Sequence, residues 1–104
     1  MSSYIVSPQA HVDLFEIASF ISQDSESVAI RFLEAAEETF TLLADSPFVG
    51  RVVNTSPSSQ TEIRVFRVRD FPHILVLYRV NGRQPHISRV VHGARDIEAL
   101  LTDD

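Results

Sequence analysis

The stretch ILVLYRVNGRQPHISRVV, residues 74–91, predicts a β-hairpin at the centre of the fold. Residues 74–78 are continuously apolar, which is the pattern of a central strand covered on both faces. Asn81-Gly82 is a strong signal for a hairpin turn. Residues 86–91 then form the returning strand. The fold class depends on what precedes this hairpin.

The segment just before the hairpin has an apolar period of two. Ile63 and Val65 alternate with polar neighbours, and Phe66 and Val68 do the same with the opposite parity. This flip predicts a bulge or bend between Val65 and Phe66. Residues 47–61 are rich in Gly, Pro, Ser, Thr and Asn, and we expect them to form a connecting loop.

Two amphipathic helices precede that loop. Ser7-Pro8 is a good start for the first, because Ser suits the N-cap and Pro suits the first helical position. The first helix should end near Gln23, and Ser25 or Ser27 can cap the second, which stops at Asp45-Ser46-Pro47. The apolar positions recur on one helix face: Ala10, Leu14, Ile17, Ala18 and Ile21 in the first, then Val28, Phe32, Ala35, Ala36, Phe40 and Leu43 in the second.

The predicted fold class is therefore α+β, with the order β-α-α-β-β-β. A helical hairpin packs on one face of a small antiparallel sheet. Residues 4–6 should add a strand to one edge, and residues 96–101 should form a short C-terminal helix. At 104 residues we expect one domain, spanning residues 1–104.

The composition excludes several kinds of site. The chain has no cysteine, so it has no disulfide framework, which fits the cytoplasm. Its four histidines show no short metal-ligand spacing, so we expect no metal site. No apolar run approaches the ~20 residues that span a bilayer, and the N-terminal residues lack the pattern of a secretory signal.

Charge is sorted along the chain. All nine cationic residues are arginines, and eight of them lie between residues 51 and 95. Residues 1–50 carry a net charge of −7, residues 51–95 carry +6 and residues 96–104 carry −4. The helices therefore carry the acids, and the helix-free face of the sheet should be a basic surface. Guanidinium groups suit carboxylate and phosphate recognition.

Several of these segments occur together in a pattern that resembles the ParE/RelE toxin superfamily of bacterial type II toxin–antitoxin modules. They are Ser7-Pro8-Gln9-Ala10, Asp13-Leu14 with Ile17, Phe20-Ile21, Leu43, Pro47, Gly50, Ile63-Arg64, Ile87-Ser88, ILVLYRV at residues 74–80 and RVVHGARDIEALL at residues 89–101. The resemblance covers essentially the whole chain. The last two segments are most similar to the ParE branch.

The resemblance implies one of two activities. ParE-like members poison DNA gyrase, whereas RelE-like members are ribosome-dependent endoribonucleases that cut mRNA. RNA cleavage needs a base, an acid and a cation, which RelE-like sites supply with lysines, arginines and a C-terminal tyrosine. This chain has no lysine and no tyrosine after Tyr78, which favours the gyrase inhibitor. A nuclease site could still use Glu62 and His92 as base and acid, with Arg64 and Arg79 as phosphate clamps.

The resemblance also implies a partner, a cognate ParD-like antitoxin with an acidic, partly disordered tail. We expect its apolar residues to lie in a groove beside the helix pair and its carboxylates to meet arginines. The residues predicted to bind the antitoxin or the target are Arg64, Arg67, Arg69, Arg79, Arg89 and Arg95. The net charge of −5 disfavours direct nucleic-acid binding unless the chain is RelE-like. No cofactor is implied, and a non-toxic binding module is a third possibility.

Three residues keep alternative interpretations. Tyr78 is expected in the core with a satisfied hydroxyl rather than in catalysis. His92 either donates a proton or caps the turn at Gly93. Arg95 either pairs with Asp96 at the start of the terminal helix or faces a partner.

Overall fold

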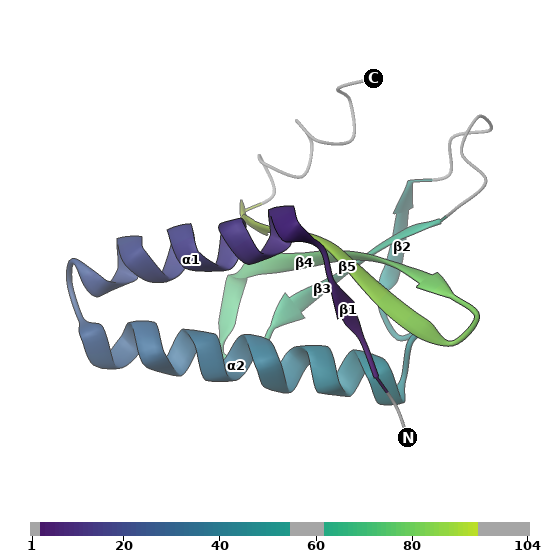
Figure 1. The fold of residues 1–104 in the computed structure, drawn as a ribbon, viewed down its shortest axis with the longest axis horizontal. Coiled ribbons are helices and arrows are strands. Elements are labelled where there is room, and N and C mark those ends of the chain that lie inside the picture. The colour runs from purple at the N-terminus through teal and green to yellow at the C-terminus, as the bar shows by residue number, and fades with distance from the viewer. Residues whose placement is uncertain (1–2, 55–61, 94–104) are drawn as a thin grey trace.

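The computed structural model describes residues 3–54 and 62–93, and these residues form an α+β fold (Figure 1). The elements are β1 (Ile5–Val6), α1 (Pro8–Ser22), α2 (Glu26–Asp45), β2 (Arg51–Asn54), β3 (Ile63–Val68), β4 (Phe71–Asn81) and β5 (Gln84–His92). The predicted fold class is confirmed. The helix expected at residues 96–101 lies outside the described residues.

Both helices begin at the predicted capping residues. The Ser7 hydroxyl accepts a hydrogen bond of 3.0 Å from the Ala10 N–H, and Pro8 takes the first helical position of α1. The Ser25 hydroxyl accepts a hydrogen bond of 3.2 Å from the Val28 N–H and so caps α2. The predicted ends of both helices are also confirmed. None of the helices in the described ranges is long and apolar enough to cross a membrane.

The hydrophobic core lies between the helix pair and one face of the sheet. Its buried members are Ala10 and Ala18 of α1, Phe32, Ala35, Ala36, Phe40 and Leu43 of α2, and Val68, Ile74, Val76, Tyr78, Ile87 and Val90 of the sheet. Alternate residues of β4 contribute, as expected where side chains of a strand alternate between faces. The apolar faces that the sequence predicts for the two helices are therefore the faces that pack on the sheet.

Strand β4 is the centre of a five-stranded sheet with the order β1-β5-β4-β3-β2. Strands β3, β4 and β5 form the predicted antiparallel meander, and β1 joins β5 as a parallel edge strand. At the β4–β5 turn, Asn81 pairs with Gln84, and Gly82 adopts a φ of +67°. The hairpin signal is therefore confirmed, and the central position of β4 explains its continuous apolar run.

Strand β2 corrects the prediction of a loop over residues 47–61. Arg51 pairs with Val65, and Val52 pairs with Arg64, in an antiparallel ladder. The segment is short and its flanks are rich in turn residues, so no period of two is visible in the sequence. It is a strand because pairing with the edge of β3 satisfies its backbone hydrogen-bonding groups.

The predicted bulge between Val65 and Phe66 is wrong in position. The pairing of β3 with β4 is unbroken across these two residues and shifts only between Arg67 and Val68. Val65 is buried outside the helix-side core, whereas Phe66 packs against that core. Because β3 carries apolar residues on both faces here, the parity of the sequence flips without a bulge.

Candidate functional site

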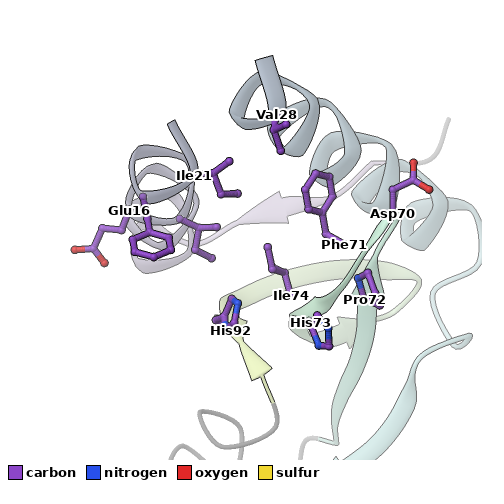
Figure 2. Close-up of a pocket in the computed structure, with 11 residues that line it drawn as sticks. Glu16, Ile21, Val28, Asp70, Phe71, Pro72, His73, Ile74 and His92 are labelled. Atoms are coloured by element: carbon purple, nitrogen blue, oxygen red, sulfur yellow. The ribbon is translucent and has the colours of Figure 1, made fainter. Parts of the chain in front are cut away.

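An apolar groove opens beside the helix pair, where α1, α2 and β4 meet. We call it the α1 groove, and its apolar lining is Ile17, Phe20, Ile21, Val28, Phe71 and Ile74. Figure 2 shows Ile21, Val28, Phe71 and Ile74 directed into one space from these three elements. The cavity volume is about 650 Å³, within the range of binding pockets. Phe20 is 69 % exposed, so the groove presents apolar surface to solvent.

Polar side chains stand at the edges of the α1 groove. Glu16 on α1 and Asp70 in the β3–β4 turn lie on opposite sides of it (Figure 2). His73 of β4 and His92 of β5 also line the groove. The groove therefore has an apolar floor with one carboxylate on each of two opposite sides. Among the residues that the structure describes, no cluster of three or more potential ligands could hold a metal ion.

The β3–β4 turn forms one wall of this groove and is anchored to α2. The Thr39 hydroxyl is buried, accepts a hydrogen bond of 3.0 Å from the Arg69 N–H and donates one of 2.8 Å to the Ala35 carbonyl. Asp70, the next residue, has a φ of +68°, a conformation that Asp tolerates better than most residues. The hydrogen bond from the turn backbone to Thr39 therefore holds the turn against α2.

A second groove lies on the other side of the same turn, between α2 and β3. We call it the α2 groove; its volume is about 520 Å³, and its lining includes Leu42, Phe66, Arg67 and Arg69. Asp70 and Pro72 line both grooves. The turn therefore divides one mainly apolar surface into two compartments.

The arginines predicted to bind a partner fall into two groups. Arg67 and Arg69 are exposed beside the α2 groove, and Arg79 is exposed opposite His86 at the other end of the sheet. Arg64 and Arg89 instead make contacts within the fold. Arg95 lies outside the described residues. The structure thus brings Arg67 and Arg69 together and separates them from the others.

Arg64 holds the link between α2 and β2. Its guanidinium donates to the carbonyls of Gly50 (2.8 Å) and Phe48 (3.1 Å), and it lies 5.2 Å from the centre of the Phe48 ring. It also pairs with Glu62 at 3.3 Å. The Arg64 side chain is only 16 % exposed. Arg64 is therefore part of the fold rather than of an open basic surface.

Tyr78 supports the same link from the core. Its fully buried hydroxyl donates to the Pro47 carbonyl (2.8 Å) and accepts from the Gly50 N–H (2.8 Å). Burial raises the pKa of Tyr78, although the Gly50 hydrogen bond and the Arg64 charge oppose this. The predicted role of Tyr78 as a core residue with a satisfied hydroxyl is confirmed. A Cβ on Gly50 would stand 2.7 Å from Tyr78 Cε1, which explains the glycine.

Asp13 is a buried polar residue whose role the sequence does not reveal. Its carboxylate accepts from the Arg89 guanidinium at 2.8 and 3.1 Å and from the Val90 N–H at 2.9 Å. Burial would raise the pKa of Asp13, but these hydrogen bonds, one from Gln9 and the Arg89 charge together lower it. The only signal in the sequence is an acid next to the apolar stripe of α1.

The four residues of the possible nuclease site are not gathered at one point. Arg64 is opposite Tyr78 and His92 is opposite Ile74, and four residues along a strand span roughly 13 Å. Glu62 stays with Arg64, far from His92. Arg79 follows Tyr78 and therefore faces the other side of the sheet. The predicted base and acid, Glu62 and His92, therefore do not lie close enough together to act on one phosphate group.

Comparisons with known proteins agree with the fold. A family model described as the ParE toxin of the type II toxin–antitoxin system parDE matches residues 4–97. A solved structure described as a chromosomal ParDE TA system from P. aeruginosa is similar, with a TM-score of 0.69 and 17 % sequence identity. The similarity covers 89 % of this chain and 97 % of that chain. Among curated proteins, none matches this chain.

Proposed function

Because this chain belongs to the ParE toxin family of type II toxin–antitoxin systems, we propose that it arrests bacterial growth by inhibiting DNA gyrase in the cytoplasm. We further propose that a ParD-like antitoxin neutralises it. The observation that carries the choice of gyrase over mRNA is the separation of Glu62 from His92. A nuclease needs its acid and its base on one phosphate, whereas an inhibitor needs only a binding surface.

The α1 groove suits the antitoxin part of this proposal. An apolar side chain of the antitoxin gains most where it fills a concave apolar lining, and such anchors dominate the affinity of interfaces. Ile21, Val28, Phe71 and Ile74 supply that lining. Arg67 and Arg69 stand close by, across the β3–β4 turn, and can pair with carboxylates of an acidic segment.

Expression of the chain alone tests the toxin assignment. We expect growth arrest of a bacterial host, and rescue when the adjacent gene is expressed with it. Soluble protein without arrest would leave a non-toxic binding module as the function. Immunoblotting of the soluble fraction distinguishes that result from poor expression.

Assays with purified protein test the target. The protein should inhibit supercoiling by gyrase or trap cleaved DNA, and it should leave ribosome-bound mRNA intact. The variants Glu62→Ala and His92→Ala should inhibit gyrase as the parent does. Cleavage of mRNA in the ribosomal A site that either substitution abolishes would establish the RelE-like nuclease instead.

A further inference from the structure

We infer that the two grooves bind one amphipathic polypeptide segment with a fixed order of charge. The segment is neutral or cationic where it crosses the α1 groove, and acidic where it crosses the α2 groove. This inference rests on the proposed neutralisation by a polypeptide antitoxin and specifies the chemistry of the segment that binds. An acidic tail alone would not fit both compartments.

Shared wall residues make the two grooves parts of one surface. Asp70 and Pro72 line both, and the Thr39 hydrogen bonds hold the turn that carries them. A segment that leaves the α1 groove along this wall therefore enters the α2 groove directly. The apolar linings on both sides of the wall require an apolar stripe that continues across it.

Carboxylates at the α1 groove disfavour an acidic occupant there. Glu16 and Asp70 stand on opposite sides of its apolar lining (Figure 2), and neither has an ion pair within the described residues. A carboxylate of the segment at either side of the groove would be repelled by the nearer of these two acids, because exposed charges closer than the Debye length, about 8 Å at physiological salt, are only partly screened. A lysine, an arginine or a neutral side chain is favoured at this point.

Arginines at the α2 groove have the opposite effect. Arg67 and Arg69 are exposed at its lining, and no carboxylate among the described residues forms an ion pair with either. Each guanidinium group can donate two hydrogen bonds to one carboxylate of the segment in a bidentate contact. The α2 groove also contains the carboxylates Glu38 and Asp70, so its two arginines balance two acids, whereas the described lining of the α1 groove has two acids and no arginine. The preference of the α2 groove for acids therefore depends on both arginines rather than on a general positive field.

Three synthetic peptides with one shared apolar helical stripe test the order of charge. Their polar positions are all Glu in the first, all Lys in the second, and Lys in one half and Glu in the other half of the third. Titration of the full chain at physiological salt should show the mixed peptide binding about threefold to tenfold tighter than the all-Glu peptide, since each rim pair contributes little alone.

Paired variants assign the preference to named residues. Glu16→Gln with Asp70→Asn should tighten the all-Glu peptide about threefold to tenfold, because it removes both repulsions while Asn keeps the turn conformation. Arg67→Gln with Arg69→Gln should weaken the mixed peptide by a similar factor and should tighten the all-Lys peptide, because it removes the repulsion between these arginines and the lysines. Glu34→Gln with Glu37→Gln changes the net charge as the first pair does, outside both grooves, and should change none of the three affinities.

Two results would overturn the inference. One is equal binding of the all-Glu and mixed peptides that Glu16→Gln with Asp70→Asn does not alter. The other is no binding of any peptide to the folded chain. Growth arrest and its rescue by the adjacent gene are measured separately, so a chain that binds the mixed peptide but causes no arrest would contradict only the proposed toxicity.

Discussion

Arg89 and Arg67 belong to the same basic block of the sequence but lie in two different regions of the molecule. Arg89, where α1 meets β5, donates two hydrogen bonds to the buried carboxylate of Asp13. Arg67, on β3 beside α2, is exposed and lines the α2 groove. The first region uses its arginine to hold the fold together, whereas the second presents its arginine to solvent.

The difference arises from what each guanidinium meets. Asp13 is only 5 % exposed, and a desolvated carboxylate must be paired. At the β3–β4 turn, the Thr39 hydroxyl accepts the hydrogen bond of the Arg69 N–H. The turn is therefore anchored without the side chains of Arg67 and Arg69. A count of arginines in the sequence therefore overestimates the basic surface that a partner can reach.

Asp13→Ala should have the largest effect on stability. The substitution leaves the Val90 N–H buried without its partner and Arg89 without its carboxylate. We expect unfolding in urea to show a loss of about 2–4 kcal/mol. Glu34→Ala, on the exposed side of α2, is the control and should change stability by less than ~0.5 kcal/mol. Equal losses in the two variants would remove the distinction between the two regions.

Tyr78→Phe should come next, because it removes one hydroxyl that serves two buried backbone groups. The Pro47 carbonyl and the Gly50 N–H would both lose their partner, at a cost of about 1–3 kcal/mol. Urea unfolding measures this loss. Tyr4→Phe is the matched control, since no hydrogen bond of the Tyr4 hydroxyl holds the described fold. A loss no greater than that of the control would show that the α2–β2 link does not depend on Tyr78.

Acid should weaken the region around Asp13 selectively. The pKa of Asp13 is lowered from its ordinary value of 3.8 by Arg89, Val90 and Gln9 despite burial. Because the folded pKa lies below the unfolded one, the stabilisation is complete above the unfolded value and is lost as the pH falls through the folded pKa. The free energy of unfolding, measured with urea between pH 6 and pH 3, should therefore fall less steeply with decreasing pH for Asp13→Asn than for the parent chain. Equal pH dependence in the two proteins would contradict the pairing of Asp13 with Arg89.

Arg67→Gln with Arg69→Gln should have the smallest effect on stability, within about 0.5 kcal/mol. Its effect should instead appear in binding, as slower association with the antitoxin and a flatter dependence on salt, because steering sums over the exposed charges. Arg31→Gln with Arg83→Gln removes two exposed charges outside both grooves and is the control. Arg64 is left intact in this test because it holds the α2–β2 link. An unchanged association rate at low salt would assign Arg67 and Arg69 to another role.

The sequence by itself determines those elements whose causes are local. Ser7-Pro8 and Ser25 begin the helices because a cap depends on residues only three positions away. The apolar stripes of both helices and the run at residues 74–78 predict the buried faces, since periodicity depends on neighbours along the chain. The α+β class and the central hairpin follow from these signals.

Tertiary structure alone decides which residues meet across the fold. Strand β2 exists because it pairs with β3, and Arg64 is internal because the register places it beside Tyr78. Asp13 and Arg89 lie 76 residues apart in sequence, so no local pattern can reveal that they pair. The α1 groove likewise combines α1, α2 and β4. Caps and periods act over a few residues, whereas registers, ion pairs and grooves depend on contacts that only the folded chain creates.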